Sequence, residues 1–233
     1  MPRIVLLVPV VVIATLVLGL LAIAACLVRP GGAWLMPLAR LWSRLVLTSS
    51  GVRWEARSES GLDPARPAVY AANHQSLFDI PVLVLAMPTD FRMVAKKSLL
   101  FVPIFGWALW LAGFLFIDRS NRERAIGTLD QAAARLRGGT SIVVFAEGTR
   151  SRDGTLLPFK RGGFVLAIRA GVPVVPVSIA GGRSVLAKGT LRVKPGVMTV
   201  RFGAPIETAG MTYEMRDALM ARVRGQVEGA LSA

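Results

Sequence analysis

Ile142-Val143-Val144-Phe145-Ala146-Glu147-Gly148-Thr149-Arg150 is an apolar run that ends in a polar turn. Four consecutive apolar residues, three of them β-branched, predict a strand that is covered on both faces. Val174-Val175-Pro176-Val177 is a second run of the same kind. Strands buried on both faces are typical of parallel sheets that lie between layers of helices. These two runs therefore predict an α/β fold.

The segments around these two runs alternate between strand-like and helix-like patterns. Ser120 can cap a helix over residues 121–137, and Gly138-Gly139 would end it. A last helix is expected over residues 213–228. Strands are expected over residues 68–72, 91–95, 114–117, 142–146, 174–179 and 198–202. The alternation predicts a single α/β domain with a largely parallel or mixed central sheet flanked by helices.

The composition combines strong basicity with high apolarity. The chain has 233 residues, a formal net charge of +14 and a mean hydropathy of +0.55. An anionic membrane suits both features, because each Lys or Arg near such a surface contributes about 1 kcal/mol. Scattered cations without a recognised motif argue against a nucleic-acid partner. With one cysteine, Cys26, the chain cannot form an internal disulfide. With one cysteine and one histidine, His74, it also lacks the ligands for a tetrahedral zinc site.

The N-terminal residues 4–28 carry no charge and are long enough to span a hydrocarbon core of about 30 Å. Arg3 precedes the run, and the arginines that follow it place the rest of the chain in the cytoplasm by the positive-inside rule. A break at Arg29-Pro30-Gly31-Gly32 leads to residues 33–48, which read as an amphipathic interfacial helix. The first run spans the bilayer, or the pair dips into one leaflet; the sequence leaves both open.

We therefore expect a membrane anchor over residues 1–50 and a catalytic domain over residues 51–233. A cleaved signal peptide is the alternative for the anchor, and Ile23-Ala24-Ala25-Cys26 looks like a lipoprotein cleavage site. The run is longer than an ordinary signal-peptide core of about 7–15 residues. Residues 101–111, with Trp107 and Trp110, fit either the core or a membrane-facing lip.

The only histidine lies in Asn73-His74-Gln75-Ser76-Leu77-Phe78-Asp79. A regular helix would point His74 and Asp79 about 140° apart. Pro81 fits only the first turn of a helix, so the helix should begin near residues 76–79 with His74 in the turn before it. There Asp79 can fix the tautomer, and the second ring nitrogen can take a proton from a hydroxyl that attacks a carbonyl. A capping histidine beside a dipole-favoured aspartate is the other interpretation.

Basic turns follow several of the predicted strands. After the first run, Gly148 allows close backbone approach, Arg150 can grip an anion, and Glu147 could hold a substrate hydroxyl. Each such turn by itself is more often plain surface. Together they suggest a phosphate site built from loops, with further cations at Lys96, Lys97, Arg119, Lys160 and Arg161.

Four segments resemble the sequence boxes of the glycerolipid acyltransferases, and they occur in the family's order. Asn73–Asp79 is similar to the His-x4-Asp box and Phe116-Ile117-Asp118-Arg119 to the second. Phe145–Arg150 and Val172-Pro173-Val174-Val175-Pro176-Val177 are similar to the third and fourth. The most similar group is that of the bacterial 1-acyl-sn-glycerol-3-phosphate acyltransferases. The resemblance covers residues 68–179; nothing is carried over to the tail after Gly182.

The resemblance implies transfer of a fatty acyl chain from acyl-CoA or an acyl carrier protein to the sn-2 hydroxyl of lysophosphatidic acid, giving phosphatidic acid. His74 would be the base and Asp79 its orienter, and the Pro176 segment would shape the site. No metal is implied, nor any cofactor beyond the thioester co-substrate. The expected location is the bacterial inner membrane, with the catalytic domain on its cytoplasmic face. The residues expected to bind the acceptor are Glu147, Gly148, Thr149, Arg150, Arg119, Lys96 and Lys160.

Two alternatives stay open at this point. One is an acyltransferase for another lysolipid, such as a lyso-aminolipid or lysophosphatidylglycerol. The other, from a different class, is a non-catalytic membrane-surface binding protein. The sequence does not fix the donor, the acyl chain length or the oligomeric state.

Overall fold

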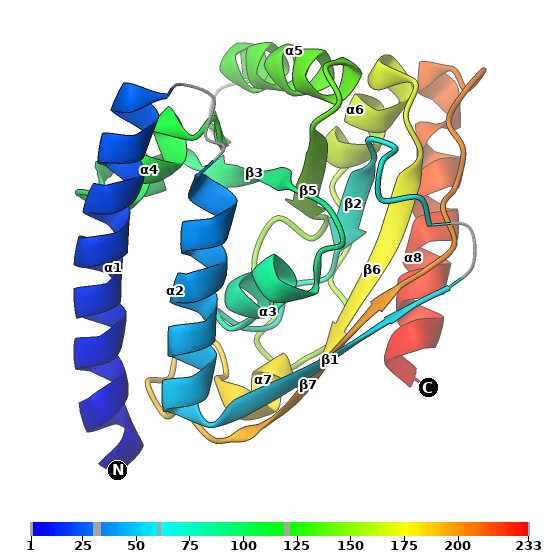
Figure 1. Cartoon of the computed structure of the whole chain (residues 1–233). Coiled ribbons are helices and arrows are strands. Elements are labelled where there is room, and N and C mark those ends of the chain that lie inside the picture. The colour runs from blue at the N-terminus through cyan, green and yellow to red at the C-terminus, as the bar shows by residue number, and fades with distance from the viewer. Residues whose placement is uncertain (1, 30–33, 60–61, 119–121, 233) are drawn as a thin grey trace.

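A seven-stranded mixed sheet lies between two layers of helices in the computed structural model, which describes residues 2–29, 34–59, 62–118 and 122–232 (Figure 1). The strand order is β1-β7-β6-β2-β5-β3-β4. All neighbouring pairs are parallel except β6 and β7, which run antiparallel. The strands are β1 (Val52–Ser58), β2 (Val69–Ala72), β3 (Phe91–Lys96), β4 (Leu115–Ile117), β5 (Ser141–Phe145), β6 (Val174–Ala180) and β7 (Gly196–Phe202).

The central strands bury both of their faces, which explains their continuous apolar runs. In β5, Ile142 and Val144 join the core on one side of the sheet, while Val143 joins the core on the other. In β6, Val174 and Val175 are divided between the two cores in the same way. Successive side chains of a strand point to opposite faces of the sheet, so a short strand contributes side chains to both cores. The predicted two-sided burial is therefore confirmed.

Two groups of helices cover the two faces of the sheet. Side chains of α5 (Arg122–Arg137), α6 (Gly162–Ala170) and α8 (Arg216–Ser232) form one core with the sheet. The other core includes α1 (Pro2–Val28), α2 (Leu35–Ser50) and α3 (Asp79–Ala86). The remaining helical segments are η1 (Lys97–Phe101), α4 (Phe105–Leu111), α7 (Gly182–Val185) and η2 (Tyr213–Met215).

The predicted strands and helices are all present, with ends that shift by a few residues. The last helix begins as the 3₁₀ turn η2 and continues to Ser232. The predicted cap at Ser120 lies outside the described residues, whereas the end of α5 at the glycine pair is confirmed, with Gly139 at φ +89°. Strand β1 was not predicted, because only its first residue, Val52, is buried.

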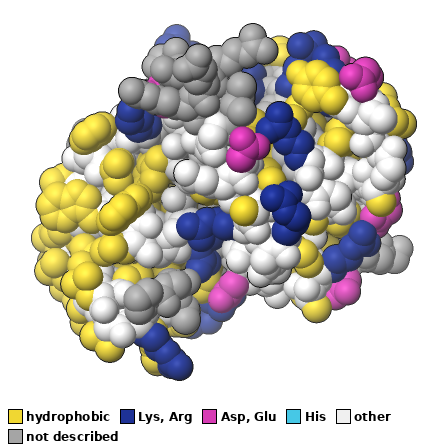
Figure 2. Space-filling model, turned by 90° about the horizontal axis from the view of Figure 1, so that it is seen from above, with side chains coloured by type: hydrophobic (Ala, Val, Ile, Leu, Met, Phe, Trp, Pro, Cys, Tyr) yellow, Lys and Arg dark blue, Asp and Glu magenta, His cyan; other side chains and the backbone are white. Residues whose placement is uncertain are grey.

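The N-terminal helices α1 and α2 lie side by side (Figure 1), and Trp42 Nε1 donates to Thr15 Oγ1 across them at 3.0 Å. α1 buries a narrow stripe that includes Leu7, Ala22 and Cys26, and this stripe belongs to the same core as the sheet. Residues 7–28 are long and apolar enough to cross a membrane, by length and composition. Figure 2 shows hydrophobic side chains gathered on the side of the molecule formed by α1 and α4.

Candidate active site

Two of the predicted boxes, those that contain His74 and Glu147, converge on one edge of the sheet. Strands β3, β5, β2 and β6 run parallel, so their carboxyl ends meet at the same edge. His74 follows the end of β2 by two residues, and Glu147 follows the end of β5 by two. This edge is where α/β proteins collect their sites.

His74 and Asp79 form a direct pair in the turn between β2 and α3. His74 Nδ1 lies 2.8 Å from Asp79 Oδ2. The same oxygen accepts the backbone N–H groups of Gln75 at 2.7 Å and Ser76 at 2.8 Å. Asp79 is the first residue of α3 and Pro81 the third, which is the predicted helix start. The Asp79 side chain is fully buried and that of His74 is 13% exposed, so the pair is fixed yet reachable.

The imidazole is held on a second side by an aromatic ring. It stacks on Phe145, with ring centroids 3.8 Å apart and an interplanar angle of 14°. Because Asp79 engages Nδ1, Nε2 is the ring nitrogen left to act on a substrate. The last residue of β5 therefore sets the plane in which that nitrogen lies.

Glu147 supports the backbone of this turn. Its Oε1 accepts the His74 N–H at 2.6 Å, and its Oε2 accepts the Leu157 N–H at 2.9 Å. The residue is 2% exposed. Burial raises the pKa of the Glu147 carboxyl, while the two N–H groups act in the opposite direction. Both oxygens are thus engaged by main chain, which fits a support for His74 better than the contact to a substrate hydroxyl that the sequence suggested.

The loop after Glu147 completes the frame around His74. Ser151 N–H donates to the His74 carbonyl at 2.9 Å, and Gln75 Nε2 donates to the Gly154 carbonyl at 3.1 Å. Lys188 Nζ donates to the Arg150 carbonyl at 2.7 Å. Consequently the main chain of this loop is tied both to the His74 turn and to the segment after α7.

The predicted phosphate-binding cations are distributed unequally around the site. Arg150 is partly buried in the loop beside His74. Lys160 is exposed, and its side-chain stem lies near Gly148, where an added Cβ would come within 3.3 Å of Lys160 Cγ. Lys96 is exposed at the end of β3, and the neighbouring Lys97 pairs with Asp118 at 3.1 Å. Arg119 lies outside the described residues.

Sequence reasoning missed two residues that position the pair. The buried Asn73 side chain bonds both backbone groups of Ile179 in β6, at 3.0 and 2.7 Å, and so ties the His74 turn to the neighbouring strand. Gly182 lies against Asp79, where an added Cβ would be 2.5 Å from Oδ1. The signal for Asn73 was its place at a predicted strand end; for Gly182 only the Gly181-Gly182 pair hinted at a close approach.

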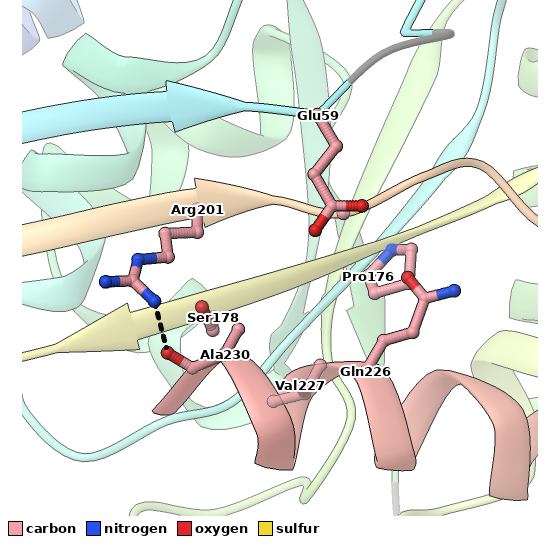
Figure 3. Close-up of a pocket in the computed structure, with 8 residues that line it drawn as sticks. Glu59, Pro176, Ser178, Arg201, Gln226, Val227 and Ala230 are labelled. Atoms are coloured by element: carbon pink, nitrogen blue, oxygen red, sulfur yellow. Dashed lines mark hydrogen bonds between the residues drawn. The ribbon is translucent and has the colours of Figure 1, made fainter. Parts of the chain in front are cut away.

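A small hollow between β6, β7 and α8 lies apart from these residues (Figure 3). Pro176, Ser178, Arg201 and Gln226 line it, and Arg201 donates to the Ala230 carbonyl at 3.0 Å. It has room for about one water molecule. None of the His74 loop residues lines it, so it is not the reaction site. Among the described residues, no three His, Cys, Asp or Glu side chains cluster to hold a metal ion.

Residues 53–180, which contain all four boxes, match the family model described as Acyltransferase. The chain belongs to this acyltransferase family. It is 37% identical over 210 residues to the human "1-acyl-sn-glycerol-3-phosphate acyltransferase alpha", which covers 90% of this chain and 74% of the human protein. It is also 37% identical over 169 residues to the Saccharomyces cerevisiae protein named "1-acyl-sn-glycerol-3-phosphate acyltransferase", covering 71% of this chain and 56% of the yeast protein.

The fold of this acyltransferase is similar to a solved relative. The crystal structure of the 1-acyl-sn-glycerophosphate (LPA) acyltransferase PlsC from Thermotoga maritima superposes with a TM-score of 0.71 and 28% identity. The match covers 84% of this chain and 80% of that one. The predicted α/β acyltransferase fold is therefore confirmed, and the chain is an enzyme of the class that transfers acyl groups.

Proposed function

We propose that this acyltransferase moves a fatty acyl chain from an acyl-CoA or acyl-carrier-protein thioester to the sn-2 hydroxyl of lysophosphatidic acid, forming phosphatidic acid. The observation that carries the proposal is the His74–Asp79 pair at the carboxyl edge of β2, 2.8 Å apart, in a chain whose relatives are named for that acceptor. This reaction is a step of phospholipid biosynthesis.

His74 acts as the general base. Nε2 takes the proton of the acceptor hydroxyl as its oxygen attacks the thioester carbonyl. The tetrahedral intermediate collapses, the C–S bond breaks, and the thiolate leaves and recovers the proton from the imidazolium. Asp79 holds the tautomer and stabilises the imidazolium as it forms. A thiolate needs little acid assistance, so one histidine serves both halves of the reaction.

The remaining side chains of the site hold the reactants and the base. Arg150 and Lys160 bind the phosphate of the acceptor, with Lys96 as a further cation at the end of β3; Arg119 stays a candidate from the sequence alone. Gly148 and Thr149 line the approach to the base. Glu147 is a positioning residue, because both of its oxygens accept main-chain N–H groups.

The location that we propose is the inner membrane of a bacterium, with the sheet on the cytoplasmic side. The buried stripe of α1 runs from Leu7 to Cys26, about 29 Å at 1.5 Å per residue, and packs against α2. A transbilayer α1 would carry α2, with Arg40 paired to Asp90, into the hydrocarbon. We therefore favour the pair lying in one leaflet, with the exposed face of α1 toward lipid.

A panel of lysolipid acceptors, offered with both thioester donors to the full chain in detergent, tests the proposal. We expect lysophosphatidic acid to give the fastest product formation. Product with lysophosphatidylglycerol or a lyso-aminolipid, and none with lysophosphatidic acid, would move the function to that acceptor. Absence of any product would favour the non-catalytic binder.

Two paired substitutions test the mechanism. His74→Ala and Asp79→Asn should each lower kcat by about 10²- to 10⁴-fold, as loss of acid–base catalysis does. Asp217→Asn is the matched control. Asp217, like Asp79, is a carboxylate paired with a basic side chain, but its pair with Arg161 is exposed. Full activity of folded His74→Ala protein would rule out His74 as the base.

A further inference from the structure

The segment η1–α4 exposes four large hydrophobic side chains, which we call the aromatic lip: Phe101, Val102, Trp107 and Trp110. Their exposed fractions are 74%, 43%, 51% and 59%. The sequence left this segment open between core and membrane-facing surface, and such exposure excludes the core for these side chains. We propose that the aromatic lip is a second bilayer contact of the enzyme, inserted beside α1.

The backbone beneath the lip is tightly built. Ile104 adopts φ +64°, which a β-branched residue rarely does. A Cβ on Gly106 would collide with the backbone carbonyl oxygen of Leu99. Gly106 N–H donates to the Val102 carbonyl at 2.8 Å and closes the turn. Strained backbone of this kind persists only where the surroundings fix it, and it clusters at functional elements. The turn thus presents the aromatic rings outward on a fixed frame.

The lip is continuous with the apolar surface of α1. Ile104 packs against Gly19, where an added Cβ would lie 2.6 Å from Ile104 Cγ2. The α1 residues 7–28 have a mean hydropathy of 3.0 and expose Val12, Leu16 and Leu20 by about half. Figure 2 shows the hydrophobic surface of α1 and α4 as one gathered area, while cations are spread over the rest of the view.

This continuity identifies lipid as the occupant. Exposed apolar patches of this kind mark protein or membrane contacts, and this one adjoins a helix of bilayer length. Tryptophan is enriched where hydrocarbon meets headgroups, because its ring is apolar and its N–H is polar. A second copy of the chain is the competing occupant. The inference rests on the proposed membrane association of α1 and adds a separate contact to it.

The position of the lip gives it a role in catalysis at a surface. β3 runs directly into η1, and β3 lies two strands from β2 in the sheet. At about 4.8 Å per strand, the end of β3 lies roughly 10 Å from the end of β2. Inserting the lip therefore brings the bilayer surface close to His74, at the edge where a lipid acceptor must arrive.

Depth-dependent fluorescence quenching tests the inference on the full chain. Variants that keep only one of the five tryptophans, with the others changed to Phe, are bound to vesicles of phosphatidylcholine and phosphatidylglycerol with or without brominated acyl chains. The chains keeping Trp107, Trp110 or Trp34 are compared. Tyr213→Trp in a chain lacking the other tryptophans is the matched control, since Tyr213 is 52% exposed next to α8, on the opposite side of the molecule from α1 (Figure 1).

We expect brominated lipid to lower the emission of Trp107 and Trp110 by at least about twofold and to leave the residue-213 control unchanged. Quenching of Trp34 without quenching of Trp107 and Trp110 would overturn the inference and keep the α1–α2 anchor. No quenching at any position would overturn both. Should the single-tryptophan chains fail to fold, the W107F/W110F double variant of the native chain must show less quenching than the native chain. Equal quenching of the double variant and the native chain would refute lipid contact. Lipid contact would also be refuted if the double substitution changed the molecular mass from that of a dimer to that of a monomer, because the lip would then bind a second copy of the chain.

Discussion

Changing Gly182 to alanine is the most direct way to disturb the His74–Asp79 pair without touching either residue. The added Cβ would lie 2.5 Å from Asp79 Oδ1, 3.0 Å from Ser76 Cβ and 3.2 Å from the methyl carbon of Met198. Asp79 cannot swing away cheaply, because it is fully buried and its other oxygen accepts three hydrogen bonds. The carboxylate or the α7 backbone must therefore move.

The size of the movement gives the size of the effect. Ordinary van der Waals contact begins at 3.4 Å, so the approach of 2.5 Å is short by about 0.9 Å. A misplacement of about 1 Å in a catalytic arrangement costs about 10²-fold in rate. We therefore expect Gly182→Ala to lower kcat by about 10²-fold, with a smaller change in KM for the lysolipid, since the three atoms nearest to the added Cβ belong to Asp79, Ser76 and Met198 and not to the loop with Arg150.

Thiol release from the acyl thioester measures kcat and KM, and thermal unfolding confirms that the variant is folded. Gly225→Ala is the matched control, because nothing lies within 4 Å of a Cβ at that position of α8. Folded Gly182→Ala protein with kcat within about twofold of wild type would refute the claim that Gly182 holds the space for Asp79. A rise in KM alone would refute it equally.

Three further changes test other parts of the structure. Glu147→Gln should lower kcat about tenfold at constant lysolipid KM. The amide of Gln can accept from only one of the two backbone N–H groups, and the lost hydrogen bond costs about 1.4 kcal/mol. A raised KM with normal kcat would instead make Glu147 a substrate ligand. Tyr70→Phe should raise the free energy of unfolding in urea by about 1 kcal/mol. The buried hydroxyl has no hydrogen-bond partner among the described residues, and burial raises the pKa of Tyr70 to about 12. A lower free energy of unfolding would mean that the hydroxyl does make a hydrogen bond. Asp153→Asn should lower the urea midpoint at pH 7, because hydrogen bonds from Thr155 and Ser151 hold the pKa of Asp153 at about 2. The folded pKa lies below the unfolded value of 3.8, so this stabilisation is present above pH 3.8 and disappears as the pH falls through about 2; a difference that persists at lower pH would contradict the assignment.

The parts of the fold that are buried on both sides could be predicted from the sequence. The run Ile142–Phe145 and the run Val174–Val177 can satisfy their backbone and bury both faces only inside a covered sheet. Pro81 fixed the start of α3, because proline is tolerated only in the first turn, and this placed His74 in the turn. Local rules sufficed in both cases.

Features that depend on distant partners could not be predicted. β1 is an edge strand with six of its seven residues exposed, so it has no hydrophobic pattern. Glu147 reads as a ligand in the sequence, and only the approach of His74 and Leu157, 73 and 10 residues away, makes it a main-chain support. The lack of space at Gly182 likewise arises from Asp79, more than 100 residues earlier.

The buried stripe of α1 has a consequence for how the protein reaches its native state. Leu7, Ala22 and Cys26 share one core with β2, β6 and β7, while the opposite face of the same helix is exposed and apolar. Helix α1 is thus needed to close a core whose last strand, β7, is synthesised about 170 residues after it. The inner face of α1 therefore stays uncovered during synthesis until the sheet is complete, so this core cannot close before β7 is made.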